Sequence, residues 1–314
     1  MRILVAGGFG YVGGRIAHVL GEAGHTVVLG TRQAASSPAW LPQARVIQLQ
    51  WQDRAALEDS CRGMDAIIHA AGMNAQDCAA DPVAALEFNG VATARLVAAA
   101  VKAGVKRVVY FSTAHVYASS LEGTITEQTC PRNLHPYATS HLAGEQVVLE
   151  AAQRRAIHGT VFRLSNAFGT PMWQGVNCWM LLVNDLCRQA VTTGELTLRS
   201  AGLQLRDFLT LEDVARAVLH VLPVGSDCLG DGLFNLGGGA AAQSILSMTE
   251  LVAERWKSLT GQSLPIVRPA PAGPSPSVLA YSSAKLLATG FSPSSRWPHE
   301  IDETLALCRA AFGR

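Results

Sequence analysis

The chain has 314 residues, of which 49% are hydrophobic and 16% charged, a composition typical of a packed globular protein and not of a disordered chain. Its formal net charge of +1 gives no electrostatic reason to expect nucleic acid or an anionic membrane as a partner. No apolar run approaches the roughly 20 residues that span a bilayer, and the start MRILVAGGFG lacks the architecture of a signal peptide. Seven scattered cysteines, without a C-x-x-C pair or metal-ligand spacing, predict reduced thiols in a cytoplasmic protein with no metal site.

The first half of the chain alternates short apolar runs with segments of helix length. The runs are rich in Val and Ile, which predicts buried strands, and Gly24, Gly63 and Gly104 stand where the intervening helices should end. This alternation predicts a parallel sheet covered by helices on both faces. The expected strands are 2–6, 26–30, 45–49, 66–70, 107–112 and 160–165, and the expected helices are 11–24, 54–63, 82–104 and one starting near Tyr137.

A glycine-rich loop, VAGGFGYVGG, follows the first expected strand and opens the first helix. Its glycines form G-x-x-G-x-x-G, which allows a tight turn, close approach of the backbone to a pyrophosphate, and contact between helical N–H groups and phosphate. The strand–loop–helix context makes a dinucleotide site much more specific than the motif alone. The predicted fold is α/β, a Rossmann-type doubly wound parallel sheet, with a loop formed by Gly7, Phe9, Gly10, Tyr11, Val12 and Gly13.

The end of the second expected strand indicates which dinucleotide binds. An acidic residue there would bond the ribose 2′-hydroxyl of NAD, and a basic residue would accommodate the 2′-phosphate of NADP. The chain has Thr31 and Arg32 at this place and no carboxylate. This favours NADP; the alternative is that Arg32 is an ordinary surface residue and that NAD binds without an acidic partner.

After about residue 166 the alternation loosens. Loops lengthen at 167–179, 223–232 and 268–277, with short helices expected at 211–222 and 247–259. No flexible linker separates the two halves. We therefore expect residues 1–166 to form the dinucleotide-binding domain, which also receives later segments, and residues 167–314 to form mostly a smaller substrate-binding lobe interleaved with it.

Several further motifs occur in a fixed order along almost the whole chain. They are HAAG (69–72), Asn89 in FNGVATARLVAAA, VVYFSTAHVYA (108–118), Tyr137 at 24 residues after Thr113, FRLSNAFG (162–169), LQLRDFLTLEDVARA (203–217) and LFNLGGG (233–239). Together they resemble the extended short-chain dehydrogenase/reductase family, the NAD-dependent epimerase/dehydratase group that acts on nucleotide sugars. The resemblance implies that Ala70 and Ala71 line the cofactor and that Gln50 contacts its adenine.

The resemblance also implies a catalytic pair. Thr113 matches the family's Ser/Thr and Tyr137 its acid/base, which exchanges a proton with the substrate oxygen while hydride passes to or from the nicotinamide. His141 stands where the family has a lysine that binds the nicotinamide ribose and lowers the pKa of the tyrosine. A neutral imidazole could still hydrogen-bond a ribose hydroxyl, but it would stabilise a phenolate very little. Reduced or lost activity is therefore an open alternative.

Two further differences from the family's motifs restrict the types of reaction that the resemblance implies. The dehydratases carry Asp-Glu after the catalytic Thr, whereas this chain has Ala114 and His115, so dehydration is not expected. The 3,5-epimerase/reductases have a cysteine where Ala114 stands. Simple hydride transfer at one carbon remains, as 4-ketoreduction or 4-epimerisation.

The resemblance implies a nucleotide-sugar substrate as well. Arg206 matches the arginine that contacts the nucleotide diphosphate, Asn166 matches a substrate-binding asparagine, and Arg268 is a weaker candidate for phosphate. Arg206 could instead pair with Asp207 or Glu212. The expected function is an NAD(P)-dependent nucleotide-sugar reductase or epimerase, and the alternatives are a non-catalytic NADP-binding sensor and a reductase of a non-sugar ketone. A homodimer formed through helices 82–103 and 137–153 is a family expectation.

Overall fold

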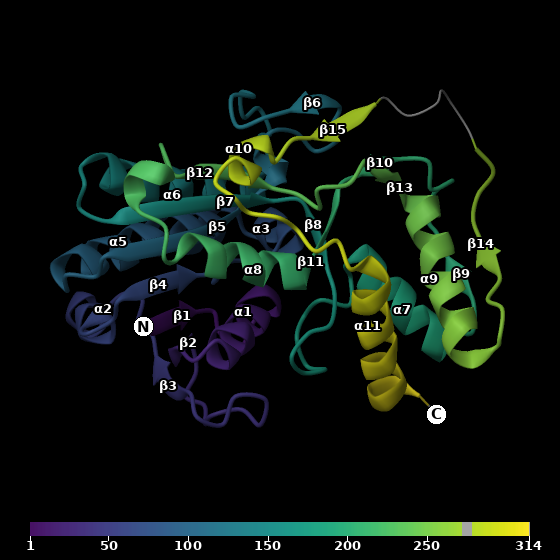
Figure 1. Cartoon of the computed structure of the whole chain (residues 1–314), viewed down its shortest axis with the longest axis horizontal. Coiled ribbons are helices and arrows are strands. Elements are labelled where there is room, and N and C mark those ends of the chain that lie inside the picture. Colours follow the sequence, from purple (N-terminus) through teal and green to yellow (C-terminus); the bar gives the residue numbers. More distant parts are fainter. Residues whose placement is uncertain (272–277, 314) are drawn as a thin grey trace.

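Seven parallel strands form the central sheet of the computed structural model, which describes residues 1–271 and 278–313 (Figure 1). Their order is β12-β7-β5-β4-β1-β2-β3. This confirms the doubly wound Rossmann-type fold expected from the sequence. The strands are β1 (Arg2–Ala6), β2 (Thr26–Thr31), β3 (Arg45–Gln48), β4 (Ala66–His69), β5 (Arg107–Thr113), β7 (His158–Leu164) and β12 (Leu233–Leu236).

Helices cover both faces of this sheet because successive residues of each strand point to opposite faces. In β1, Ile3 and Val5 belong to the apolar core under α1 (Tyr11–Glu22) and α8 (Leu211–Val221). Leu4 and Ala6 belong to the core on the other face. That second face is covered by α2 (Arg54–Cys61), α5 (Thr93–Lys102) and α6 (Pro136–Gln153).

The prediction of one uniform helix over residues 82–104 is wrong in detail, because the helix type changes along this range. The structure has α3 (Ala75–Ala80) and α4 (Pro82–Ala85), then a π-helical segment, η1 (Leu86–Ala92), before α5. In the π-helical segment the Asn89 carbonyl accepts a hydrogen bond from the Thr93 hydroxyl at 2.6 Å, and the Asn89 amide bonds Ser140 Oγ at 3.0 Å. These contacts join the segment to α6, a local arrangement that hydrophobic periodicity does not reveal.

The helical stretch Pro82–Lys102 also changes the expectation that no run is long enough to span a membrane. It has 21 residues and a mean hydropathy of 1.3, so by length and composition alone it would suffice. Half of this stretch is buried inside the protein, and it packs against α2 and α6. Core helices have the same properties, so the stretch is weak support for a membrane span.

The second lobe, on the right in Figure 1, packs three helices around a separate apolar core. These are α7 (Leu182–Thr192), α9 (Ile245–Thr260) and α11 (Trp297–Phe312). Short strand pairs surround them and join the lobe to the sheet domain: β8 (Asn166–Phe168) with β11 (Phe208–Thr210), β10 (Leu205–Arg206) with β13 (Gln243–Ser244), β9 (Leu196–Thr197) with β14 (Ile266–Val267), and β6 (Gly123–Ile125) with β15 (Leu279–Tyr281). Short helices complete the described chain: η2 (Ala114–Val116), η3 (Ser226–Cys228) and α10 (Ala284–Leu287). The Pro-rich loop expected at 268–277 lies mostly outside the described residues.

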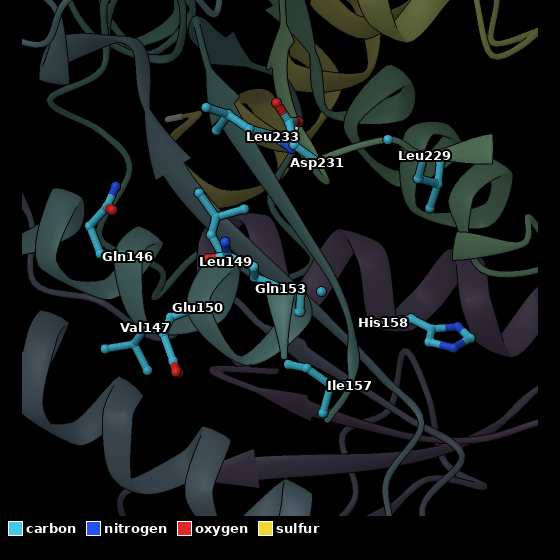
Figure 2. Close-up of a pocket in the computed structure, with 13 residues that line it drawn as sticks. Gln146, Val147, Leu149, Glu150, Gln153, Ile157, His158, Leu229, Asp231 and Leu233 are labelled. Carbon is cyan, nitrogen blue, oxygen red and sulfur yellow. Dashed lines mark hydrogen bonds between the residues drawn. The ribbon is translucent and has the colours of Figure 1, made fainter. Parts of the chain in front are cut away.

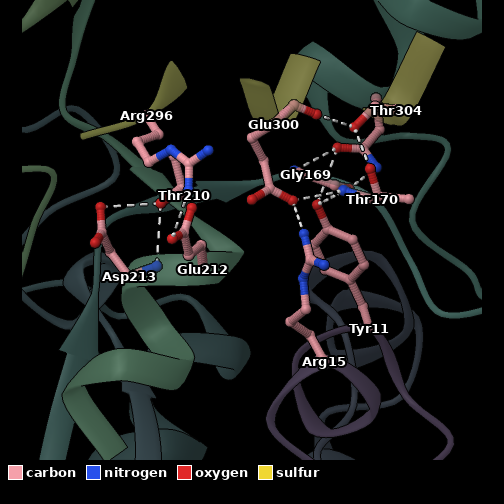
Figure 3. Close-up of polar contacts among 11 residues, drawn as sticks. Tyr11, Arg15, Gly169, Thr170, Thr210, Glu212, Asp213, Arg296, Glu300 and Thr304 are labelled. Atoms are coloured by element: carbon pink, nitrogen blue, oxygen red, sulfur yellow. Dashed lines mark hydrogen bonds and ion pairs between the residues drawn. The ribbon is translucent and has the colours of Figure 1, made fainter. Parts of the chain in front are cut away.

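Helix α1 joins the two lobes through polar contacts (Figure 3). The Tyr11 hydroxyl lies 2.9 Å from both the Gly169 carbonyl and Asn184 Oδ1. One turn later, Arg15 forms an ion pair with Glu300 of α11, which is 1% exposed. The helix that follows the glycine-rich loop is therefore fixed to the second lobe.

A buried ion pair fixes α6 on the sheet. Glu145 of α6 and Arg163 of β7 are 0% and 3% exposed, with Arg163 Nη2 2.6 Å from Glu145 Oε2. The Ser112 hydroxyl also donates to Glu145, and Arg163 Nη1 donates to the Tyr117 hydroxyl at 2.9 Å. Removing one charge from such a pair leaves the other buried without compensation.

We therefore expect Glu145→Gln to lower the free energy of unfolding by about 3–5 kcal/mol, measured by urea denaturation. Glu150→Gln is the matched control on the same helix, because Glu150 forms an exposed pair with Arg154 and such pairs contribute at most about 1 kcal/mol. Equal losses in the two variants would contradict the structural importance of the buried pair.

Candidate active site

A cavity of about 330 Å³ opens where β5 and β7 end, between the sheet and the second lobe. Thr113 and Tyr137 line it, and so do Asn166 and Arg206. The carboxyl ends of parallel strands are the usual ligand sites of this architecture. The structure thus brings the expected acid/base pair and two expected substrate residues into one cavity. Tyr11 and Val12 of the glycine-rich loop line it as well.

The glycine-rich loop has the shape that a pyrophosphate requires. Gly7 has φ +83°, and a Cβ there would lie 2.7 Å from the backbone nitrogen of Ala71. A Cβ on Gly13 would lie 2.3 Å from the Gly7 carbonyl oxygen. Helix α1 begins directly after Gly10 with no side-chain cap, so its first N–H groups are available to phosphate oxygens. These residues fit a dinucleotide, with Ala70 and Ala71 beside the loop.

Arg32 and Gln50 line a second, open hollow of about 760 Å³ at the edge of the sheet. The guanidinium of Arg32 lies over the ring of Phe88, with 5.6 Å from Cζ to the ring centroid. Asp53 lines the same hollow but caps α2, accepting from the Ala56 amide at 3.0 Å. The hollow therefore offers a cation and an amide at the place expected for the adenosine half of the cofactor.

Tyr137 enters the cavity because α6 begins one residue earlier. Pro136 occupies the first turn, and the His135 ring accepts from the Tyr137 amide at 3.2 Å. Burial raises the pKa of Tyr137, and a hydrogen bond to the Thr113 side chain opposes this with a smaller effect. Thr113 is itself buried at the end of β5. Tyr137 is thus a phenol at neutral pH, a proton donor held beside a second hydroxyl.

His141 lies one helical turn below Tyr137, with its ring edge-on to the phenol at a centroid distance of 4.6 Å. Its Nδ1 lies 2.9 Å from the hydroxyl of Tyr110. Burial lowers the pKa of His141 to about 4. The residue that replaces lysine is therefore an uncharged imidazole at neutral pH, and it supplies no positive charge to stabilise a phenolate.

Arg206 faces the cavity as a cation without an acidic partner among the described residues. Its Nη1 donates to Asn166 Oδ1 at 3.3 Å and its Nη2 to Gln204 Oε1 at 3.2 Å. The alternative of a structural ion pair is not observed: Asp207 accepts from the Gly238 amide, and Glu212 pairs with Arg296. The guanidinium is thus available to an anionic ligand.

Arg268, the third residue expected to bind substrate, lies outside the cavity. Its Nη1 donates to the Ala201 carbonyl at 2.8 Å, its side chain is exposed, and it does not line the cavity. A role of Arg268 in phosphate binding stays a prediction.

One residue of the cavity, His115, was not predicted from the sequence as a functional group. His115 lines the cavity two residues after Thr113, and its ring centroid lies 6.4 Å from that of Tyr137. Burial, Arg206 and His135 together lower its pKa. In the sequence, His115 stands out only as the residue in place of a dehydratase acid, although its position two residues after Thr113 is a signal that it could lie near a bound ligand.

Another cavity, of about 890 Å³, is lined by the carboxyl-terminal half of α6 (Figure 2). It includes Ile157, His158 and Leu233, at the amino ends of β7 and β12, and Gln146 and Glu150 on the outer side of α6. None of the expected catalytic or cofactor residues lines it. It is therefore not the candidate active site.

Residues 3–237 match the model of the NAD dependent epimerase/dehydratase family. The chain belongs to this family. UDP-glucose 4-epimerase of Azospirillum brasilense is 27% identical over 285 residues, covering 84% of this chain and 79% of the relative. The UDP-glucose 4-epimerase of Corynebacterium glutamicum is 28% identical over 311 residues, covering 93% and 91%.

Solved structures of the family share the fold. The UDP-glucose 4-epimerase of Thermus thermophilus in complex with NAD superposes with a TM-score of 0.80 at 25% identity, covering 99% of this chain and all of that one. The similarity of this chain to that structure confirms the resemblance to the family that the ordered sequence motifs indicated.

Two buried histidines predict how stability depends on pH. Burial lowers the pKa of His141 to about 4 and that of His69 to about 3, while both titrate near 6.5 in the unfolded chain. The unfolded state therefore binds more protons than the native state below pH 6.5, so their contribution to stability is complete above 6.5 and is lost as pH falls toward 4.

We expect His141→Gln to reduce the pH dependence of the unfolding free energy between pH 6.5 and 4.5 by up to about 1.4 kcal/mol per pH unit, one proton's contribution. Urea unfolding at several pH values measures it. His158→Gln, an exposed histidine, is the control. An unchanged slope in His141→Gln would mean that His141 is not held neutral by the fold.

Proposed function

We propose that this protein is an NAD(P)-dependent oxidoreductase that acts on a nucleotide-linked sugar, with hydride transfer at C4 and reduction of a 4-ketone as the favoured direction. One observation carries the proposal: Thr113 and Tyr137 share a cavity with the unpaired cation Arg206 and with the end of the dinucleotide loop. This arrangement supports a role of Tyr137 as a proton donor between a dinucleotide at the loop and an anion at Arg206.

The chain's residues have distinct chemical tasks in this reaction. The bound dinucleotide supplies the hydride. As the carbonyl carbon of the sugar gains it, negative charge develops on the carbonyl oxygen, and the Tyr137 hydroxyl donates its proton there while Thr113 hydrogen-bonds the same oxygen. Because burial raises the pKa of Tyr137, the phenol carries its proton at neutral pH, which is the form that protonates the oxygen of a ketone. Alcohol oxidation would need the phenolate instead, so this protonation state supports ketone reduction; 4-epimerisation, which needs both directions, is the alternative.

A nucleoside diphosphate sugar fits the chemistry of the cavity. No carboxylate side chain lines it, whereas Arg206 and His115 do. Arg206 is oriented by Asn166 and would bond the diphosphate, for which a guanidinium suits two oxygens at once. The UDP-glucose 4-epimerases among the relatives support this class of substrate.

Dehydration is not proposed although some relatives have this activity, such as the dTDP-D-glucose 4,6-dehydratase of Mus musculus, 27% identical over 79% of this chain. Ala114 is buried and carries no acid, and His115 has replaced the second acid. The chain therefore lacks the acidic pair that the family uses to eliminate water.

A second candidate is a sensor that binds the dinucleotide without turnover. The observation that favours it is the neutral, buried His141 in place of lysine. Incubation with NADPH or NADH and a panel of 4-keto nucleotide sugars separates the two: bound cofactor with no oxidation across the panel supports the sensor.

We propose a cytoplasmic homodimer, as in the sequence expectation. The residues that support it are apolar and exposed on the expected dimer helices: Val83 is 70% exposed, Leu86 50% and Val91 42%. Size-exclusion chromatography with light scattering tests the dimer.

Tyr137→Phe should reduce turnover by at least about 100-fold, the usual range for a lost acid/base group, because the hydroxyl left beside the oxygen, that of Thr113, is a much weaker acid than a phenol. The measurement is NADPH oxidation with a 4-keto nucleotide sugar. Cofactor affinity should stay unchanged, which serves as the control for folding. Unchanged turnover would remove Tyr137 from the mechanism.

The NADP preference rests on Arg32, the exposed cation of the adenosine hollow. We expect Arg32→Ala to weaken NADPH by about tenfold or more, the value of a hydrogen bond to a charged group, with little change for NADH. Fluorescence titration measures both. Arg54→Ala is the matched control, since Arg54 lines the same hollow but pairs with Glu58. Equal losses for NADPH and NADH in Arg32→Ala would contradict the preference.

A further inference from the structure

Tyr110 lies three residues before Thr113, on the face of β5 that packs against α6. It is 1% exposed and belongs to the apolar core on that side, whereas the next residue, Phe111, belongs to the core of the opposite face. Gly144 of α6 makes room for it, because a Cβ at Gly144 would lie 2.5 Å from the Tyr110 hydroxyl oxygen. The hydroxyl therefore points into the core beside the helix that carries Tyr137 and His141.

Within the core the Tyr110 hydroxyl meets the His141 side chain. It lies 2.9 Å from Nδ1, and its next contact with His141, the backbone carbonyl, is longer at 3.5 Å. Burial and then the nearby Glu145 raise the pKa of Tyr110 well above its usual value. The phenol thus keeps its proton and has it to donate.

The neighbouring hydroxyl of Thr93 has its own partners. It donates to the Asn89 carbonyl at 2.6 Å, and its oxygen lies 2.9 Å from Nε2 of His69. Nδ1 of His141, at 2.9 Å, is the acceptor that the geometry favours for the Tyr110 proton. When Nδ1 of a neutral imidazole accepts a hydrogen bond, its proton is on Nε2.

Nε2 of His141 faces the cofactor side of the fold. A Cβ on Gly72 would lie 3.6 Å from Nε2 and 3.4 Å from Cε1. Gly72 directly follows Ala70 and Ala71, the backbone segment that contacts Gly7 of the dinucleotide loop. The free nitrogen of the ring is thus on the side where the cofactor would bind.

We propose that Tyr110 is a positioning residue for His141: its hydroxyl donates to Nδ1, fixes the tautomer with the proton on Nε2, and so presents an uncharged N–H donor to a hydroxyl of the cofactor's nicotinamide ribose. The ribose contact rests on the proposed function, whereas the tautomer is a property of the protein alone. The fixed ring replaces the directional hydrogen bond of the missing lysine but not its charge.

Nitrogen-15 NMR of the cofactor-free protein, labelled at histidine, tests the tautomer directly. The His141 signals are assigned from their loss in His141→Gln. We expect an unprotonated Nδ1 shifted by an accepted hydrogen bond, and a protonated Nε2. In Tyr110→Phe the Nδ1 shift should move to that of an unbonded nitrogen, while the His69 signals, set by Thr93, stay unchanged. A protonated Nδ1 in the wild type, or no change in Tyr110→Phe, would overturn the proposal.

Cofactor affinity then tests the positioning role by a double-mutant cycle. Tyr110→Phe should weaken NADPH by about three- to tenfold, as for one hydrogen bond. In the His141→Lys background the same change should have less than a twofold effect, because a lysine needs no tautomer. An equal loss in both backgrounds would show that Tyr110 only supports the fold, and would overturn the positioning role.

The reductase function and the positioning role of Tyr110 can be contradicted independently of each other. If NMR shows the expected tautomer and the cycle shows coupling, but no nucleotide sugar is turned over, the reductase function fails and the positioning of His141 stands. If turnover occurs and Tyr110→Phe changes neither the Nδ1 shift nor NADPH affinity, the function stands and the inference fails.

Discussion

The packing of α6 against β5 is the constraint on which the site depends. One side of the helix carries Tyr137, His141, Gly144 and Glu145, at spacings of four, three and one residues, and each has a partner on the sheet side. Glu145 bonds Ser112 and Arg163 inside the core. Because that ion pair is buried and fully bonded, a sliding or tilting of α6 would leave charges unpaired, so the helix has one stable position. The phenol at its amino end therefore has a fixed place relative to Thr113.

This packing also explains how a histidine is accommodated where the family resemblance implies a lysine. A lysine at this position would carry its charge on a long flexible stem, whereas an imidazole is short and must be oriented by the core around it. Here the orientation comes from Tyr110 through Nδ1 and from the edge contact with Tyr137. The histidine does not supply the positive charge that a lysine would have. His141 adds no cation to offset the effect of burial, which raises the pKa of Tyr137 and keeps the phenol protonated at neutral pH.

The sequence predicted the sheet domain well because its signals are local. Buried parallel strands are continuous apolar runs, helix ends carry glycine, and Gly24, Gly63 and Gly104 all have positive φ, between 71° and 80°. The glycine-rich loop and the position of Thr113 could be predicted for the same reason, since each belongs to a short motif at a strand end. Contacts between distant segments could not be predicted. Arg15 and Glu300 are 285 residues apart, and no periodicity indicates that they meet. The π-helical segment around Asn89 depends likewise on tertiary partners in α6 and the loop after β4.

Helix α1 links the phosphate loop to the second lobe. Its first turn lies at the phosphate loop, where the Tyr11 side chain lines the substrate cavity and its hydroxyl contacts Gly169 and Asn184 of the second lobe. Its second turn holds α11 through the pair Arg15–Glu300, and Glu300 in turn accepts from the Thr170 amide at 3.1 Å. The substrate-facing loop 169–181 is thus positioned by the same helix whose amino end would bind the cofactor. The proposed hydride transfer would demand close contact between cofactor and substrate, and the polar contacts of α1 link the phosphate loop directly to the second lobe that borders the cavity.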